Sequence, residues 1–328
     1  MDAVEVEGEE LRRLLWDPSG PLPGASETRP PLVVVDLDGG EEALEGLPAP
    51  SGLPAVVVGR SARSDLPPEA CDLVVAPGTD ELDLVVDAVR SNPVASMALV
   101  ELLRCSPGMT VDAGLLAESA SYGVLQSGEE HRRWREGRSS RQPLVVDEPV
   151  LAARRGSELR VTLHRPERRN ALDVTMRDAL AEQLQLARLD TGIESILLDG
   201  AGPDFCAGGD LDEFGSFGDA SLAHLVRMER SLGRMLHAVA ERVTVHLHGA
   251  CIGSGIELAA FAGTVHAAPD VSIGLPEVRM GLIPGAGGTV SLTRRAGRHR
   301  TCWLALTGAR LDATTALGWG LVDRVLER

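Results

Sequence analysis

The stretch GSGIELAAF, residues 253–261, places an acid, Glu257, inside an apolar run that begins with two glycines. Twenty residues after Glu257, within the stretch GLPEVRMGLIPGAGGT, residues 274–289, a second acid, Glu277, directly follows a proline. A carboxylate that is buried without a partner destabilises the fold by several kcal/mol or has its pKa raised. Two acids in such surroundings therefore predict a chemical role for this part of the chain.

The composition excludes several classes of protein. The chain has 328 residues, of which 44% are hydrophobic, so it can bury one large core with an appendage or form two domains. It carries 32 basic and 48 acidic residues, a net charge of −16, which argues against binding to nucleic acid or to a membrane surface. Because all of these basic residues are arginines, Schiff-base chemistry, a lysine nucleophile and a Walker A loop are excluded.

The N-terminal stretch and the cysteines indicate where the protein resides. The chain opens with MDAVEVEGEE, which is acidic where a signal peptide would be basic, and no apolar stretch approaches the roughly 20 residues of a membrane span. Its five cysteines are scattered and contain no Cys-x-x-Cys pair, as is typical of reduced thiols. We therefore expect a soluble, cytoplasmic protein.

The hydrophobic pattern divides the chain into four parts. Residues 1–30 are expected to form a tail or one docking helix, and residues 31–79 contain short β-branched runs typical of buried strands in an α/β layer. Residues 80–138 change to helical periodicity and predict a helical subdomain. After a polar, arginine- and serine-rich boundary, residues 144–328 alternate between strand and helix patterns. This alternation predicts a parallel sheet with helices packed on it.

Two glycine-rich turns carry the candidate chemistry. The turn HGACIGSGIELA, residues 248–259, leads into a helix predicted to begin near Ser254, and a helix start presents unpaired amides to a ligand oxygen. Ser254 and Glu257 are three residues apart and share one face of that helix. The turn GPDFCAGGDLDEF, residues 202–214, carries Gly208 and Gly209 before Asp210 and can supply a second amide. Two such amides predict an oxyanion hole for a thioester enolate, beside acids that can move protons.

Five stretches together resemble the crotonase (enoyl-CoA hydratase/isomerase) superfamily. In chain order they are LHRPERRNALD (163–173), GPDFCAGGDL (202–211), HGACIGSGIELA (248–259), GLPEVRMGLIPGAGGT (274–289) and LTGARLDATTALGWGLVDRV (306–325). The resemblance implies an α/β, crotonase-like (ClpP/crotonase) fold, a spiral of ββα units, here with an additional helical subdomain. It also implies an acyl-CoA thioester substrate, with coenzyme A as part of the substrate and no further cofactor.

The resemblance assigns roles residue by residue. Gly209 and Ser254 match the amides that bind the thioester oxygen, and Glu257 and Glu277 match the two catalytic glutamates of the hydratases, so addition of water to a 2-enoyl-CoA is the expected reaction. Residues that match positions near the thioester or its CoA are Arg165, Arg168, Arg169, Ala207, Leu211 and Gly285. The three arginines are a candidate phosphate-binding patch. A solvated surface face is the rival interpretation of the same run.

Some features depart from the family pattern or leave alternatives open. His246 and His248 lack a visible third ligand, so no metal site is expected. The chain ends where the family continues into further helices, and residues 80–138 resemble those helices, which suggests a circular permutation or a fusion in which they cap the pocket. The alternatives in function are double-bond isomerisation or another specialised thioester reaction, and a non-catalytic acyl-CoA-binding subunit. A homo-oligomer, a trimer or hexamer, is the assembly that the resemblance implies.

Overall fold

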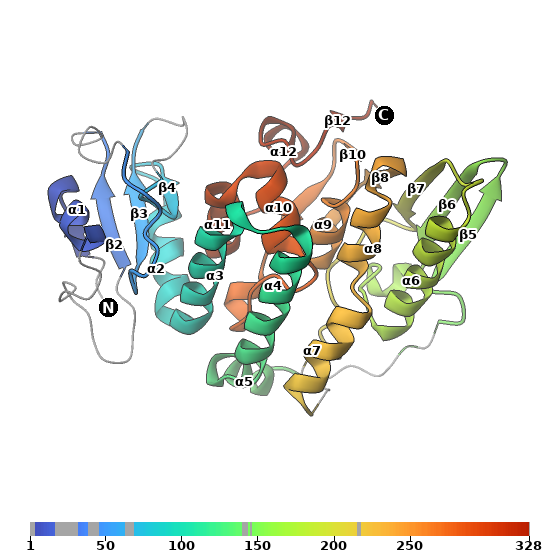
Figure 1. Cartoon of the computed structure of the whole chain (residues 1–328), viewed down its shortest axis with the longest axis horizontal. Helices are drawn as coiled ribbons and strands as arrows, with labels where there is room; N and C mark the ends of the chain where they lie inside the picture. Colours follow the sequence, from blue (N-terminus) through green and yellow to red (C-terminus); the bar gives the residue numbers. More distant parts are fainter. Residues whose placement is uncertain are drawn as a thin grey trace.

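A computed structural model describes residues 4–16, 32–38, 46–62, 69–139, 144, 146–214 and 218–327. Within these ranges the strands form three sheets, and helices pack between and over them (Figure 1). The predicted α/β class is confirmed. A four-stranded sheet and a six-stranded sheet lie towards opposite ends of the molecule, and helices occupy the space between them (Figure 1).

The six-stranded sheet is the frame of the second half of the chain. Its strands are β5 (Val150–Arg155), β6 (Glu158–Leu163), β7 (Ser195–Gly200), β8 (Val243–Leu247), β10 (Thr264–Ala267) and β12 (Arg324–Val325). They lie in the order β12-β10-β8-β7-β6-β5, and every pair is parallel except the β5–β6 hairpin. The predicted parallel sheet is therefore confirmed.

A small second sheet produces the expected spiral. Strand β9 (Ala250–Ile252) pairs in parallel with β11 (Ser272–Gly274). The chain passes from β8 through β9 into helix α9 (Ser254–Ala259), and from β10 through β11 towards helix α10 (Gly288–Ala296). Each passage places one strand in the large sheet, the next in the small sheet, and then a helix. This repeated order is the crotonase-like arrangement of ββα units.

The remaining helices of this half surround the two sheets. They are α6 (Val174–Leu189), α7 (Ala220–Glu229), α8 (Leu232–Ala238), α11 (Arg298–Thr307) and α12 (Ala313–Gly318). Helices α7 and α8 follow each other closely but do not form one continuous helix. The break occurs because Ser231 caps α8, its side chain accepting a hydrogen bond from Arg234 N at 3.3 Å. Serine favours this capping position over a helix interior.

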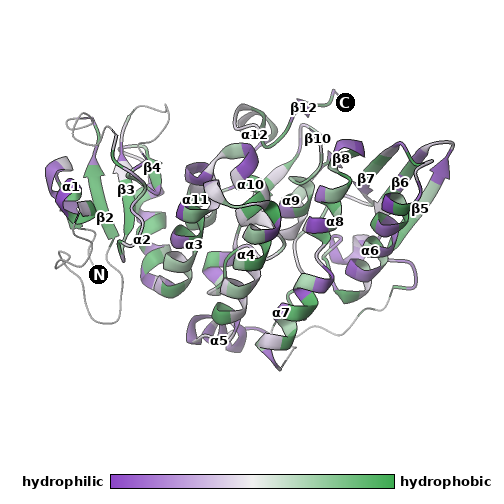
Figure 2. Cartoon of the chain, in the orientation of Figure 1, coloured by the Kyte–Doolittle hydropathy of each residue, from purple (hydrophilic) through white to green (hydrophobic). Residues whose placement is uncertain are grey.

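The N-terminal sheet is parallel throughout. It contains β1 (Val4–Val6), β2 (Leu32–Asp36), β3 (Val56–Arg60) and β4 (Leu73–Val75), in that order. Both β2 and β3 are hydrophobic along most of their length (Figure 2) and bury four of their five residues. Helix α1 (Gly8–Trp16) is the docking helix foreseen for the first part of the chain, but β1 was missed, because three alternating residues are too short a pattern to predict a strand.

Four helices over residues 80–138 confirm the predicted helical segment. They are α2 (Glu81–Ser91), α3 (Pro93–Cys105), α4 (Val111–Gln126) and α5 (Glu129–Glu136). Buried side chains of β2–β4, of α2–α4 and of the strands and helices beyond residue 158 belong to one continuous hydrophobic core. The first and second halves of the chain are thus packed together through apolar side chains. In the described ranges, no helix is both long enough and apolar enough to cross a membrane.

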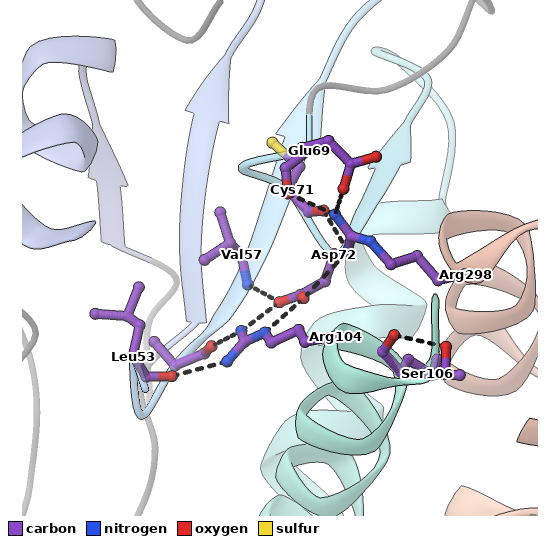
Figure 3. Close-up of polar contacts among 10 residues, drawn as sticks. Leu53, Val57, Glu69, Cys71, Asp72, Arg104, Ser106 and Arg298 are labelled. Carbon is purple, nitrogen blue, oxygen red and sulfur yellow. Dashed lines mark hydrogen bonds and ion pairs between the residues drawn. The ribbon is translucent and has the colours of Figure 1, made fainter. Parts of the chain in front are cut away.

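A buried ion-pair cluster also joins the two halves (Figure 3). Arg104 on α3 donates to both carboxylate oxygens of Asp72, at 2.9 and 2.6 Å, and both side chains are at most 2% exposed. Asp72 also accepts a hydrogen bond from Val57 N on β3 at 2.8 Å. Arg298 on α11 donates to Cys71 O at 3.0 Å and pairs with Glu69 at 2.9 Å. The cluster therefore connects the N-terminal sheet to α3 and to α11.

Candidate active site

One cavity of about 400 Å³ brings the predicted catalytic residues together. It is lined by Gly209, Ser254, Glu257, Glu277 and Gly285, all singled out from the sequence. Part of the lining comes from α4, α7 and α8, with Leu115, Glu118, Ser119, Tyr122, Gln126, Ala223, Val226, Arg227 and Leu232. Helix α4, from the first half of the chain, therefore covers a cavity whose acids come from the second half.

The two predicted acids converge on Gly253. This glycine has φ +50°, a left-handed conformation that side-chain-bearing residues rarely adopt. A Cβ added at Gly253 would lie 2.4 Å from Glu277 Oε1 and 3.8 Å from Glu257 Oε1. The absence of a side chain at Gly253 is thus what allows the Glu277 carboxyl group to approach the start of α9.

Glu257 is held by the loop that precedes α10. Its Oε2 accepts hydrogen bonds from Ala286 N at 2.8 Å and from Gly288 N at 2.9 Å. These bonds favour the ionised form, but the side chain is 2% exposed and burial raises its pKa to about 7. A carboxyl group with this pKa can both give and take a proton near neutral pH.

The carboxyl group of Glu277 has fewer hydrogen-bond partners than that of Glu257. It begins the short 3₁₀ helix η5 (Glu277–Met280), is 8% exposed, and its Oε2 is buried without a hydrogen-bond partner among the described residues. Burial, followed by the nearby charge of Glu257, raises its pKa well above the usual range.

A third buried acid, Glu118 on α4, was not predicted as a site residue. It accepts hydrogen bonds from Gly287 N at 2.7 Å, from Thr289 N at 2.9 Å and from Thr289 Oγ1 at 2.6 Å. Burial, with the charge of Glu257 second, raises its pKa to about 8. The only signal in the sequence was an acid within the apolar run GLLAES, residues 114–119.

The two glycine-rich turns lie side by side because residues 206 and 251 form a parallel bridge. Cys206 N donates to Ala250 O and Ile252 N donates to Cys206 O, both at 3.0 Å. The amide of Gly209 and that of Ser254, the first residue of α9, donate to no acceptor among the described residues. Two free amides on adjacent turns, both lining the cavity, are suited to hold one developing oxyanion.

Of the three arginines expected to bind the CoA phosphates, only two are accessible to a ligand. Arg165 is 2% exposed, pairs with Asp173 at 3.1 Å and Asp210 at 3.2 Å, and donates to Ala171 O at 2.6 Å. Its assignment to CoA phosphates is therefore corrected: its guanidinium group is committed to holding this segment beside the turn that carries Gly209. Arg169 is exposed, although it pairs with Asp204 at 2.6 Å, and Arg168 is half-buried.

The other predicted ligand-binding residues lie near the turns. Ala207 and Leu211 are half-buried on either side of Gly209, and Ala207 N donates to Arg169 O at 2.9 Å. Gly285 packs against the Tyr122 ring, and a Cβ added there would lie 2.4 Å from that ring. The structure thus places Ala207 beside residues 165–169 and Gly285 beside α4.

The histidines form no metal centre in the described part of the chain. His246 stacks on His266 of the neighbouring strand, with ring centroids 5.4 Å apart, and His248 Nε2 lies 3.2 Å from Gly202 O. In those same ranges, no group of three His, Cys, Asp or Glu side chains has a metal-binding arrangement.

A spiral of ββα units with two glycine-rich turns beside buried acids is the architecture of the crotonase superfamily. The chain belongs to the enoyl-CoA hydratase/isomerase family, whose sequence profile matches residues 154–328. The crystal structure of enoyl-CoA hydratase from Thermoplasma volcanium GSS1 superposes with a TM-score of 0.51 at 35% identity, covering 55% of this chain and 72% of that one.

Curated relatives have names from the same family. The 1,2-epoxyphenylacetyl-CoA isomerase of Escherichia coli (strain K12) is 37% identical over 172 residues, which cover 51% of this chain and 65% of that protein. The 2,3-dehydroadipyl-CoA hydratase of the same strain is 33% identical and is covered to 68% of its length. The chain thus spans about two thirds of the length of these relatives, and its first half lies outside the family match.

Proposed function

We propose that the protein adds water reversibly to a 2-enoyl-CoA thioester. The observation that carries this proposal is the meeting of Glu257 and Glu277 at Gly253, in a cavity that also contains the free amides of Gly209 and Ser254. Burial raises the pKa of both acids, so the pair can share a single proton near neutral pH. One acid can then act as a base while the other acts as an acid.

The reaction follows from this arrangement. The ionised member of the pair removes a proton from a bound water, whose oxygen forms a bond to the β-carbon. The electrons of the double bond move towards the thioester oxygen, and the resulting enolate is stabilised by the amides of Gly209 and Ser254. The protonated member then delivers its proton to the α-carbon. The net change is the addition of one water, and no further cofactor is needed.

The proposal includes how the substrate is held and how the protein assembles. Arg169, which is exposed, and Arg168 remain the candidates for contacts with CoA phosphates, whereas Arg165 does not. A homo-oligomer is proposed from the family resemblance, and the exposed apolar side chains Leu116, Val124, Leu222 and Leu225 on α4 and α7 support a subunit contact there. Light scattering on the purified protein would determine the number of subunits.

The experiment that tests the hydratase proposal is the pair Glu257→Gln and Glu277→Gln. Each amide keeps the shape of the side chain but cannot transfer the proton, so we expect the hydration rate to fall by about 10²–10⁴-fold in each variant. Loss of the conjugated enoyl thioester absorbance measures the rate. Glu182→Gln, an exposed position on α6, serves as the matched control. Normal activity in either cavity variant would end the assignment.

Isomerisation of the double bond is the second candidate, because the family to which the chain belongs is described as enoyl-CoA hydratase/isomerase. It uses the same enolate but returns the proton to another carbon without consuming water. Product analysis in H₂¹⁸O separates the two reactions, since only hydration places the label in the product. Tight binding of enoyl-CoA without either product would instead indicate the non-catalytic subunit.

A further inference from the structure

A single arginine, Arg227 on α7, stands out among the residues that line the cavity. Its Nε donates to Ser119 Oγ at 3.1 Å, its Nη2 to Ser119 O at 3.2 Å and its Nη1 to Gln126 Oε1 at 3.3 Å. Its guanidinium group lies 4.8 Å from the centroid of the Tyr122 ring. All of these partners belong to α4, which runs beside α7 (Figure 1), and none of them is a carboxylate.

This lack of a carboxylate partner is unusual for an arginine in such a position. Arg227 is half-buried, and burial is the largest influence on its pKa, which is lowered. Charged groups that leave water are normally paired with an opposite charge. Arg177, which lines the same cavity, pairs with Asp178 at 2.9 Å, and the buried Arg165 pairs with two acids. Among the described residues, Arg227 has no ion pair.

The guanidinium group of Arg227 also has N–H groups that form no hydrogen bond with a described residue. An arginine has five N–H donors in a planar fork that matches the two oxygens of a carboxylate. Three donors are used within the protein, one on each nitrogen, so each terminal nitrogen keeps one N–H. Arg230, which directly follows the last residue of α7, lines the same cavity and forms no ion pair with a described residue. This side of the cavity therefore presents two arginines that have no ion-pair partner among the described residues, although the charge of Glu118 on α4 favours the charged form of Arg227.

The acyl chain is the part of the substrate that would reach Arg227 when the thioester oxygen is held by the amides of Gly209 and Ser254. The segment leading from Arg165 lies beside the Gly209 turn, where Leu172 N donates to Gly208 O at 2.8 Å. Helix α4 lies on another side, against the loop that cradles Glu257, where Gly285 meets Tyr122 and Gly287 meets Glu118. An acyl chain whose carbonyl is held at Gly209 and Ser254 and which passes Glu257 is thus directed towards α4 and α7.

We propose that Arg227 binds a carboxylate at the distal end of the acyl chain, so that the preferred substrates are CoA thioesters of 2-enoic diacids. This inference rests on the proposed hydratase function and adds the class of substrate to it. The apolar side chains of Leu115, Ala223, Val226 and Leu232 would surround the methylene groups between the thioester and that carboxylate. The free N–H groups of Arg227 would bind the carboxylate, with Arg230 adding positive charge.

The test compares substrates of equal chain length that differ only at the distal carbon. Hex-2-enedioyl-CoA is assayed against hex-2-enoyl-CoA, and the same pair is repeated two carbons longer, with the full-length protein. We expect at least one diacid to have a kcat/KM about tenfold or more above that of its monoacid. In Arg227→Met the diacid should lose about 10²-fold while the monoacid changes little, and Arg227→Lys should recover part of the loss.

A matched control and a binding experiment separate the alternatives. Arg234→Met removes a second arginine that connects to α4, through Asp112 at 2.7 Å, but does not line the cavity, and it should keep the preference for diacids. Equal activity of wild type on both members of each pair would overturn the inference. An equal loss for both substrates in Arg227→Met would also overturn it, because Arg227 would then only join α7 to α4. Weaker binding of free CoA to Arg227→Met would overturn it as well, because Arg227 would then bind the CoA phosphates.

Failure of the proposed function has a different signature. If no enoyl thioester is hydrated, calorimetry with the saturated analogues adipoyl-CoA and hexanoyl-CoA still measures the contribution of the distal carboxylate. Tighter binding of adipoyl-CoA to wild type, lost in Arg227→Met, would uphold the diacid site while the hydratase function falls. Equal binding of the two analogues would overturn the diacid site as well.

Discussion

Glu118 on α4 and Glu257 on α9 accept hydrogen bonds from alternate backbone amides of one loop. Gly287 N and Thr289 N donate to Glu118, and Ala286 N and Gly288 N donate to Glu257. The loop is therefore fixed between two buried carboxylates, one from each half of the chain. The geometry of a proposed catalytic acid depends in this way on a helix that lies outside the family match.

The first prediction concerns Glu118→Gln. The amide presents only one oxygen to three donors, so the loop should shift and Glu257 should lose its alignment. We expect kcat to fall by about 10–100-fold, with a smaller change in KM, and the pH profile to shift, because a misplaced neighbour changes catalysis more than binding. Steady-state kinetics from pH 5.5 to 9 measure both effects.

The control for this variant is Glu101→Gln, at an exposed position on α3. It should leave kcat and the pH profile unchanged. A Glu118→Gln protein with the kinetics of wild type would show that the loop keeps its position without this carboxylate, and the positioning role of Glu118 would then be wrong.

The second prediction concerns Gly253→Ala. The left-handed backbone and the 2.4 Å approach to Glu277 Oε1 leave no space for a methyl group. The Glu277 carboxyl group should be displaced, and hydration should fall by about 10²-fold or more, because small displacements of a catalytic group have large effects. Gly318→Ala, at the end of α12 where a Cβ meets no atom within 4 Å, is the control. Comparable activity in the two variants would contradict the arrangement described for Gly253.

The third prediction concerns stability and pH. Burial raises the pKa of Glu118 to about 8 and of Glu257 to about 7, whereas both return to about 4.3 in the unfolded chain. At pH values between the unfolded and the folded pKa, the folded protein therefore binds more protons than the unfolded chain. The free energy of unfolding should consequently decrease as pH rises from about 4.5 to 8. One such group contributes a slope of up to about 1.4 kcal/mol per pH unit.

Urea denaturation at pH 6, 7 and 8 measures this slope. The decrease should be smaller in Glu118→Gln than in wild type, whereas Glu101→Gln should parallel wild type. His131 and His246, whose pKa values burial lowers, act in the opposite direction but are common to all three proteins, so they cancel in the comparison. Parallel slopes for Glu118→Gln and wild type would show that Glu118 titrates alike in both states.

The fourth prediction concerns the cluster in Figure 3. Asp72→Ala leaves the buried Arg104 without its carboxylate and Val57 N without its acceptor. Removal of one partner of a buried ion pair destabilises a protein by about 3–5 kcal/mol, so the urea midpoint should fall sharply. Glu129→Ala, which removes one of the exposed partners of Arg132 on α5, should leave the midpoint unchanged. A midpoint near that of wild type for Asp72→Ala would mean that Arg104 finds other partners.

The sequence predicted those parts of the fold and site that local patterns define. The four helices over 80–138 and the longer strands from 150 onwards have periodicities long enough to recognise, whereas β9, with three residues, lies inside a stretch interpreted as a turn. Glu257 and Glu277 were found because each lies in a motif that resembles the family, the first close behind two glycines and the second directly after a proline. That residues 80–138 are the family's missing helices in a new place stays a prediction.

What sequence reasoning missed depends on contacts between distant residues. Glu118 meets Gly287, 169 residues further along the chain, and no local signal reports such a pairing. Arg165 resembled a surface residue because other arginines flank it, but Asp210, 45 residues away, and Asp173 hold it inside. Arg227 went unnoticed because an arginine at the end of a helix is ordinarily solvated.

The continuous core that spans both halves limits which truncations and substitutions the protein can tolerate. Because β2–β4, α2–α4 and the later strands bury a shared set of side chains, the described part of the chain should melt in one cooperative transition. A fragment cut at the start of the family match would expose that apolar surface and aggregate. We therefore expect substitutions in α4 to be tolerated as poorly as substitutions in the glycine-rich turns, although α4 lies outside the family match.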